Sequence, residues 1–325
     1  MAFTTPSRQS RQRPAARRPL VRCTAALASG VAVLLGAAAC STSSADSANG
    51  TTVINAIGAE NEYANVLSQI GGQYVHVSAI LDNPNTDPHA FEASPQVAQQ
   101  VSSAQLIVQN GVGYDGWMTK IESASPNPNR KVIVVQHVLG LPDSAPNPHL
   151  WYDPKTMPAA AKVMAADLSA LQPVHKAYFQ ARLTAFDHAL TPWLTAIAQF
   201  KAKHPGTLAA TTEPVADYLL TAMGIRNLTP FTFQADIMHG VDPAPQNIAL
   251  EDSFFSQHKV KVFAYNQQVV DSLTTSIRLN ASKDGVPVVG VYETMPSGYN
   301  YQSWMLAEVN AITKAITSKV STQKL

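Results

Sequence analysis

Short apolar runs alternate with longer amphipathic stretches along most of the chain. In the first half, four runs favour buried strands, and helical patterns separate them. The predicted strands are 52–57, 75–81, 106–109 and 132–136, and the predicted helices are 61–71, 95–102 and 115–122. Because strands that alternate with helices form parallel sheets covered on both faces, this order predicts an N-terminal α/β lobe over residues 52–154.

The same order returns in the second half of the chain. The predicted strands are 207–211, 227–231, 260–265 and 286–291, and the predicted helices are 214–223, 245–257, 269–282 and 301–319. We therefore expect a C-terminal α/β lobe over residues 205–325. The predicted fold class is α/β, with two lobes that both contain mostly parallel sheets.

Residues 155–204, between the two lobes, have a helical pattern. Apolar residues recur at intervals of four and three in its second part, at Phe179, Leu183, Phe186, Leu190, Trp193, Ile197 and Phe200. This spacing predicts one continuous helical stripe, and a long helix joining the lobes would limit hinge motion between them. Pro192 interrupts the stripe. We expect either a kink there or a new helix capped by Thr191.

Residues 1–39 have the pattern of a bacterial export signal. Six Arg residues precede an apolar run, which ends in three Ala residues before Cys40. Small residues followed by Cys are typical of lipoproteins, in which the Cys is lipidated; cleavage after Ala39 to give a secreted protein is the alternative. The pair at 17–18 (RR) also leaves a twin-arginine export route open. The polar segment 40–51 then favours a lipidated, flexible tether.

The charge balance changes once the predicted signal is set aside. The whole chain holds 23 Lys and Arg against 22 Asp and Glu, but six of the basic residues lie within residues 1–39, which contain no acid. The remainder therefore holds 17 basic against 22 acidic side chains. This balance argues against a nucleic-acid partner, because phosphate binding needs a basic surface. Since both Cys residues lie near the N-terminus, a metal site in the lobes must use His, Asp, Glu or backbone oxygen.

Four candidate ligands follow predicted strands. His89 comes after the strand at 75–81 and His149 after the strand at 132–136, each directly preceded by Pro; Glu213 follows 207–211, and Glu293 follows 286–291. Ligands of open α/β sheets bind at the carboxyl ends of the strands. Two imidazoles from one lobe and two carboxylates from the other could therefore hold one divalent transition metal in the inter-lobe cleft. Two alternatives remain open: Glu213 as an acid in the first turn of a helix, where it complements the helix dipole, and Glu293 as a solvated loop charge.

Five short segments carry a more specific signal. They are 70–72 (IGG), 87–89 (DPH), 110–117 (NGVGYDGW), 147–151 (NPHLW) and 291–293 (VYE). In these segments the chain resembles the cluster A-I solute-binding lipoproteins of metal ABC importers, the manganese/zinc-binding family. The resemblance implies two lobes joined by a long rigid helix and one metal ion bound between them. It also implies delivery of that ion to a membrane permease driven by a cytoplasmic ATPase.

The resemblance also implies roles for single residues. His89 and His149 match the first two ligands of the family, and Glu213 matches the third, which is His in typical zinc members and Glu in typical manganese members. Glu293 stands where the family usually has Asp. Asn266 lies near another acidic position of the family, so no extra ligand is expected there. A His-rich loop common in zinc-specific members is missing. Zn²⁺ and Mn²⁺ stay open as cargo, with Fe²⁺ behind them.

Other functions remain as alternatives. A secreted metal-dependent hydrolase would need an open metal position that activates water. The sequence contains neither an HExxH helix nor a GxSxG elbow, so we do not expect an enzyme. An adhesin role and the binding of an organic solute are further alternatives. We expect a monomer that is lipid-anchored at Cys40 and lies at the cell surface or on the periplasmic side of the bacterial cytoplasmic membrane.

Overall fold

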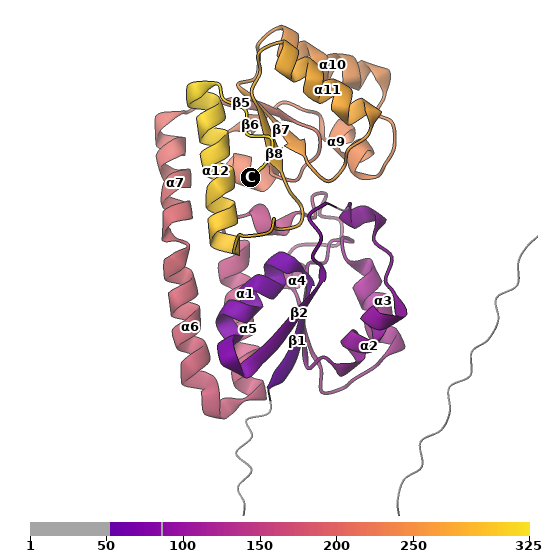
Figure 1. Ribbon diagram of the computed structural model, residues 1–325, viewed down its shortest axis with the longest axis vertical. Helices are drawn as coiled ribbons and strands as arrows, with labels where there is room; N and C mark the ends of the chain where they lie inside the picture. Colours follow the sequence, from indigo (N-terminus) through magenta and orange to yellow (C-terminus); the bar gives the residue numbers. More distant parts are fainter. Residues whose placement is uncertain (1–52, 86) are drawn as a thin grey trace, which may run out of the picture. The chain divides into compact units, whose positions relative to one another are not determined.

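The computed structural model describes residues 53–85 and 87–325. The predicted export signal, Cys40 and the predicted tether therefore lie outside the described residues. Within them, the chain forms two four-stranded sheets, and every pair of neighbouring strands is parallel (Figure 1). This confirms the predicted fold of two α/β lobes. No helix within the described ranges combines the length and the apolar character needed to cross a membrane.

The N-terminal lobe is built on a sheet with the strand order β2-β1-β3-β4. Its elements are β1 (Ile54–Glu60), α1 (Asn61–Gly71), β2 (Val75–Leu81), α2 (Pro95–Ser103), β3 (Leu106–Gln109), α3 (Gly116–Ala124), β4 (Lys131–Val134) and α4 (Val135–Val138). Side chains alternate across the sheet, as a strand requires. Ile54 and Ala56 of β1 belong to the core shared with α1, whereas Ile57 and Ala59 belong to a smaller core beneath α2 and α3.

The C-terminal lobe repeats this arrangement, with the strand order β6-β5-β7-β8. Its elements are β5 (Leu208–Thr211), α8 (Asp217–Ala222), β6 (Arg226–Asn227), α9 (Phe231–Met238), α10 (Pro245–Ser256), β7 (Val262–Asn266), α11 (Ser272–Lys283), β8 (Val288–Val291) and α12 (Tyr301–Ser318). Single-turn 3-10 helices also occur, at η1 (Gly72–Tyr74), η2 (Pro88–Ala90), η3 (Leu150–Tyr152) and η4 (Pro173–His175). The shared strand order gives the two sheets equivalent carboxyl edges, where the loops of each lobe gather.

Three helices occupy the segment between the sheets. They are α5 (Thr156–Leu171), α6 (Lys176–Ala189) and α7 (Thr191–Lys203). The interruption predicted at Pro192 is confirmed, because α6 ends at Ala189 and a new helix starts at Thr191. The predicted cap is wrong: Leu190 occupies the N-cap position without a side-chain hydrogen bond, because Thr191 is already helical. The α6 helix packs against α1 and α5, and α7 packs against α12, so the pair runs alongside both lobes (Figure 1).

One hydrophobic core continues through both lobes. It contains Leu67 and Trp151 from the first half, Trp193 from α7, and Val289 and Trp304 from the second half. The apolar stripe predicted for the joining segment lies in this core, apart from Leu183, which is partly buried against it. Separating the lobes would expose this shared surface to water, at a cost of about 25 cal/mol for each Å² of apolar area. The shared core therefore opposes separation of the lobes, and restricted hinge motion between them stays a prediction.

Two predicted strands end earlier in the structure than in the sequence prediction. The strand predicted at 227–231 is reduced to β6, because Pro230 cannot donate to a strand ladder and instead precedes α9. The strand predicted at 132–136 ends at Val134, and residues 135–138 form a helical turn. In both places the chain leaves the sheet earlier than its apolar pattern indicates.

Candidate metal centre

The carboxyl edges of the two sheets bring three predicted ligands together. His89 lies in η2 after β2, His149 lies directly before η3 in the segment after β4, and Glu293 follows β8. One side-chain donor atom from each of these residues lies within 4.8 Å of the other two. Of the four predicted ligands, Glu213 is not part of this group. Two imidazoles and one carboxylate at this spacing are a donor set that suits a divalent transition metal.

Local structure fixes the position of His89. Asp87 caps the 3-10 turn, because its Oδ1 accepts a hydrogen bond of 2.8 Å from the His89 backbone N–H. Pro88 precedes the histidine and restricts the backbone at that point. The Nε2 atom of His89 is 3.2 Å from Glu293 Oε2, but no partner among the described residues has hydrogen-bond geometry with it. The His89 imidazole therefore faces the Glu293 carboxylate, and its Nε2 atom is not used in a hydrogen bond.

Asn147 fixes the tautomer of His149. The Asn147 Oδ1 atom accepts the His149 backbone N–H at 3.0 Å and lies 2.8 Å from His149 Nδ1. Its Nδ2 donates to the Pro214 carbonyl of the other lobe at 2.8 Å, so the orientation of the amide is determined. Because Oδ1 can only accept, the imidazole proton must be on Nδ1. His149 Nε2 then presents a lone pair to the site.

Electron pairs therefore converge where the three side chains meet. His149 Nε2 lies 3.2 Å from Glu293 Oε2. Burial lowers the pKa of His149, which favours the neutral imidazole, and the tautomer leaves no proton between these two atoms. The lone pair on the nitrogen and the carboxylate oxygen face each other, and a cation between them would satisfy both.

Glu293 is the anionic centre of the group. Burial opposes its ionisation, but protonated His149 and then protonated His89 would outweigh burial and hold its pKa below the ordinary range, and a metal ion would take the place of these protons. Tyr114 Oη donates to Glu293 Oε2 at 3.0 Å. Burial lowers the pKa of His89, but the carboxylates of Glu293 and Asp87 together outweigh burial and raise it. The carboxylate thus stays charged although its side chain is fully buried.

Asn266 connects the fourth candidate to this centre. The last residue of β7, it donates from Nδ2 to Glu213 Oε1 at 2.9 Å and to Glu293 Oε1 at 2.7 Å. Burial, and after it the charge of Glu293, raise the pKa of Glu213 well above its ordinary value. Glu213 Oε2 is buried and has no hydrogen-bond partner among the described residues. Glu213 is therefore linked to Glu293 through the Asn266 amide, and its Oε2 atom has no hydrogen-bond partner among the described residues.

Sequence reasoning missed three residues of the site. Tyr114 and Asn147 lie inside the segments 110–117 and 147–151, but neither was singled out as a partner of the ligands. The sequence predicts no ligand at Asn266, whereas in the structure its side chain bridges two carboxylates. A usable signal exists for Asn266, since a polar residue that ends a fully buried strand must have a partner at the sheet edge.

Aromatic rings enclose the cluster. Tyr114 and Trp151 pack edge-on against His149, at centroid distances of 5.9 and 5.5 Å, and Tyr114 packs similarly against His89 at 5.3 Å. These rings keep water from most of the polar atoms and lower the local dielectric constant, which strengthens the interaction of the carboxylate with a cation. Two parallel α/β lobes that enclose a polar cluster at their junction define a two-lobed binding protein.

The comparison with protein families identifies the family. Residues 59–315 match the family described as ZnuA, zinc-uptake complex component A periplasmic, and the chain belongs to this family. Among curated proteins, the metal ABC transporter substrate-binding lipoprotein ScbA of Streptococcus cristatus is 26% identical over 169 residues, which make up 48% of this chain and 54% of that protein.

Two further likenesses agree with this assignment. The manganese ABC transporter substrate-binding lipoprotein PsaA of Streptococcus pneumoniae is 28% identical over 179 residues, or 50% of this chain and 55% of that protein. The chain thus spans about half the length of the curated relatives it matches. Among solved structures, the periplasmic zinc binding protein TroA of Treponema pallidum has a TM-score of 0.70 at 18% identity, covering 81% of this chain and 99% of that chain. At this identity the likeness shows the fold alone.

Proposed function

We propose that the chain captures one divalent transition-metal ion outside the cytoplasmic membrane and delivers it to the permease of an ABC importer, which a cytoplasmic ATPase drives. The convergence of His89 Nε2, His149 Nε2 and Glu293 Oε2 carries this proposal. Membership of a zinc-uptake family, and the names of relatives described as metal ABC transporter lipoproteins, support it. Nothing among the described residues favours the hydrolase alternative.

The ligand set of the proposed site comprises His89, His149 and Glu293, with Glu213 as a fourth ligand. Rotation of the Glu213 side chain away from Asn266 would free both of its oxygens. With two neutral imidazoles and two ionised carboxylates, the bound divalent ion would be neutralised. The set suits Zn²⁺ and Mn²⁺, and Fe²⁺ less well. Intrinsic affinity is expected to be higher for Zn²⁺ than for Mn²⁺, as for most nitrogen and oxygen donor sites.

The N-terminal segment supplies the proposed place of action. Its Arg-rich start, apolar run and small residues before Cys40 favour export and lipid attachment. An anchored monomer with a flexible tether over residues 40–51 would keep the cargo near the permease. Mass spectrometry of the membrane-extracted protein tests the anchor, because a lipid on Cys40 adds a defined mass that a Cys40→Ser variant lacks.

Metal analysis of the purified protein tests the function. We expect one equivalent of metal after dialysis against a mixture of Zn²⁺, Mn²⁺ and Fe²⁺. His89→Ala and Glu293→Gln should lose it, because each removes one donor of the converging group. Glu122→Gln is a matched control, a partly buried carboxylate on α3 that is outside this group. A wild-type protein without metal, or variants that keep a full equivalent, would contradict the proposal.

A further inference from the structure

The donors of the proposed site differ in how they can be reached. The side chains of His149 and Glu293 are completely buried, whereas 21% of the His89 side chain is exposed. An ion that enters from solvent must therefore approach the cluster on the His89 side. Any group that assists entry has to face the same space as His89.

One cavity meets this condition. It has a volume of about 410 Å³, and His89 lies in its wall. The N-terminal lobe contributes residues near Tyr114 and Pro148, and the C-terminal lobe contributes Phe231, Met238 and His239. His239 is the second imidazole in this wall, and no Lys, Arg, Asp or Glu of the described chain lines it. The cavity thus joins two imidazoles, one from each lobe, across a mainly apolar lining.

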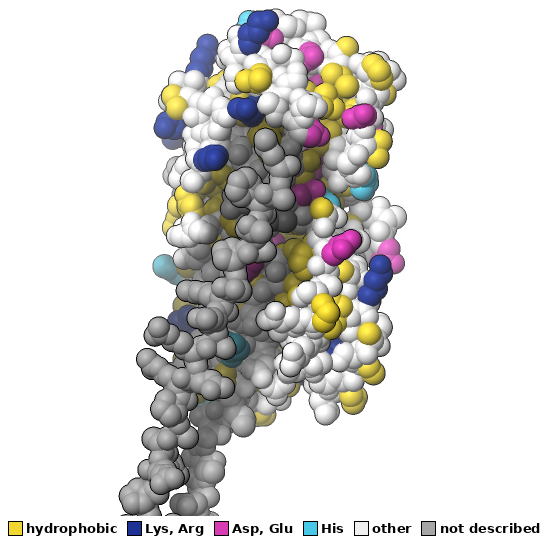
Figure 2. All heavy atoms as spheres, turned by 45° about the vertical axis from the view of Figure 1, so that its right-hand side comes forward, with side chains coloured by type: hydrophobic (Ala, Val, Ile, Leu, Met, Phe, Trp, Pro, Cys, Tyr) yellow, Lys and Arg dark blue, Asp and Glu magenta, His cyan; other side chains and the backbone are white. Residues whose placement is uncertain are grey.

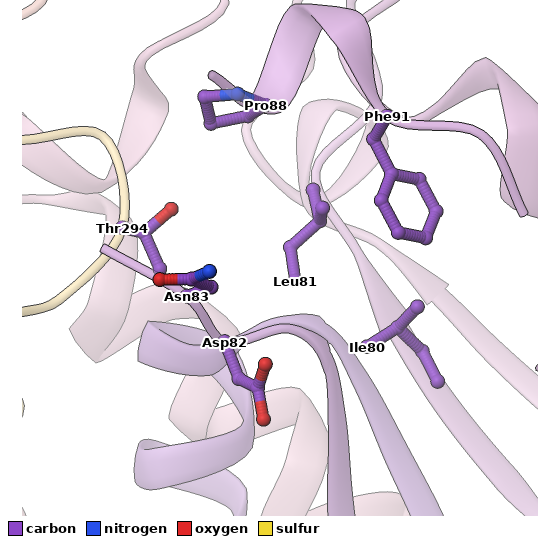
Figure 3. A pocket seen from close by; sticks show the side chains of 7 residues that line it. All are labelled: Ile80, Leu81, Asp82, Asn83, Pro88, Phe91 and Thr294. Atoms are coloured by element: carbon purple, nitrogen blue, oxygen red, sulfur yellow. The ribbon is translucent and has the colours of Figure 1, made fainter. Parts of the chain in front are cut away.

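A neighbouring cavity does not meet the condition. The pocket shown in Figure 3 has a volume of about 180 Å³ and lies beside the loop that carries His89. Its lining consists of Ile80, Leu81, Asp82, Asn83, Pro88, Phe91 and Thr294. No imidazole lines it. The larger cavity, with two imidazoles in its wall, is therefore the one that meets the condition.

The position of His239 favours the binding of a cation. It is the C-cap residue of α9, and its side chain is exposed. The carboxyl end of a helix carries a partial negative charge, which attracts cations nearby. On the face shown in Figure 2, acidic and histidine side chains of the described residues lie at the height where the two lobes meet.

We propose that His239 and His89 form a transient first binding site, at which the incoming metal ion exchanges water for imidazole before it reaches His149 and Glu293. This inference rests on the proposed function and adds an entry step to it. The ion exchanges one water for the His239 imidazole and another for His89 Nε2, a buried atom that has no hydrogen-bond partner in the described chain. It then leaves His239 as the two buried donors replace it. No proton or electron is transferred if both imidazoles are neutral.

A transient ligand on the path has a distinctive kinetic signature. Since His239 does not contact the ion in the final state, its loss must slow association and dissociation by the same factor and leave the Kd unchanged. Stopped-flow mixing of the full chain with Zn²⁺ alone, followed by release to a chromogenic chelator, measures both rates. We expect His239→Ala to slow each by roughly 10-fold, a barrier increase of about 1.4 kcal/mol.

Two further variants complete the test. His239→Cys keeps a metal-binding side chain at this position and should restore much of the rate. His188→Ala removes an exposed histidine from α6, outside the cavity, and should change neither rate. Unchanged rates in His239→Ala would overturn the entry step, and so would a weaker Kd with normal association. If the wild-type chain itself bound no Zn²⁺, the proposed function would fail instead, so the two failures can be distinguished.

Discussion

Replacing Asn147 tests how the site is prepared for a metal ion. Asn147 does not belong to the converging donors, yet it holds the imidazole proton on His149 Nδ1 through a contact of 2.8 Å. In Asn147→Leu this acceptor is lost, and the buried Nδ1–H has no partner. Leaving a buried donor without a partner costs about 1–3 kcal/mol. The imidazole can avoid this cost by moving its proton to Nε2, where Glu293 Oε2 lies 3.2 Å away and would accept it.

That shift would block the metal, because the lone pair needed for coordination would carry a proton. Loss of a group that orients a metal-binding histidine weakens affinity by about 10–100-fold. We therefore expect Asn147→Leu to bind Zn²⁺ 10–100-fold more weakly, equivalent to about 1.4–2.7 kcal/mol. Asn147→Asp keeps an acceptor for Nδ1–H, although it loses the hydrogen bond to the Pro214 carbonyl, and should bind more tightly than the Leu variant.

Competition titration against a chelator of known affinity measures these differences, and thermal unfolding shows whether the variants fold. Asn280→Leu is a matched control, because it removes a part-buried amide hydrogen bond to Asp252 between α11 and α10. It should lower stability without changing affinity. If Asn147→Leu bound Zn²⁺ as tightly as the wild type, or if the Asp and Leu variants lost affinity equally, Asn147 would not set the tautomer of His149.

Three further predictions concern pH and packing. Affinity for Zn²⁺ should fall as pH decreases from 8 to 5, by up to about tenfold per pH unit for each imidazole that must lose a proton. Because the pKa of His89 is raised, the loss of affinity should begin at a higher pH than for an ordinary imidazole. An affinity that stays constant over this pH range would exclude imidazole ligation. Burial raises the pKa of Glu308 to about 8, above its ordinary value. The neutral form it keeps in the folded chain therefore contributes stability that is complete below about pH 4.5 and is lost as pH rises through 8. Glu308→Gln should remove this loss of stability, so the melting temperature of the variant should rise relative to that of the wild type between pH 5 and pH 8. A difference in melting temperature that stays constant with pH would contradict a raised pKa for Glu308. In Gly58→Ala, the new Cβ would overlap the backbone nitrogen of Ala64 in α1. We therefore expect denaturant unfolding to show a destabilisation of about 1–3 kcal/mol. An unchanged unfolding midpoint would show that α1 can shift at no cost.

The parallel sheets could be predicted because each strand carries its own signal. A short β-branched run between helical patterns identifies a buried strand without knowledge of its neighbours, as at 75–81 and 286–291. The end of β1 shows where this reasoning fails. The residues at 58–60 (GAE) lack strand propensity, yet they continue the strand, because Gly58 pairs with both β2 and β3. Pairing to neighbours, which a single run does not contain, extends the element.

The site was only partly predictable for a related reason. His89, His149 and Glu293 could be proposed because a ligand at the carboxyl end of a strand is specified by its own position in the chain. The role of Asn266 depends on register, since β7 pairs Asn266 with Val291, two residues before Glu293. That pairing places the amide between two carboxylates from different loops. A contact set by the register of three strands cannot be read from any one segment.

The distribution of burial also constrains how the proposed cargo could be released. The core shared by the two lobes, which includes Trp151, Trp193 and Trp304, resists their separation. Hydrogen bonds from Tyr152 Oη to the Tyr292 carbonyl and from Tyr301 Oη to the Trp151 carbonyl join the halves directly beside the cluster. Opening the whole junction would break these contacts together with the core. A movement limited to the loop that carries His89 would leave these hydrogen bonds in place and would uncover a donor whose side chain is already 21% exposed. Release by the side on which the ion enters is therefore the less costly route, and both steps would depend on the same segment of the chain.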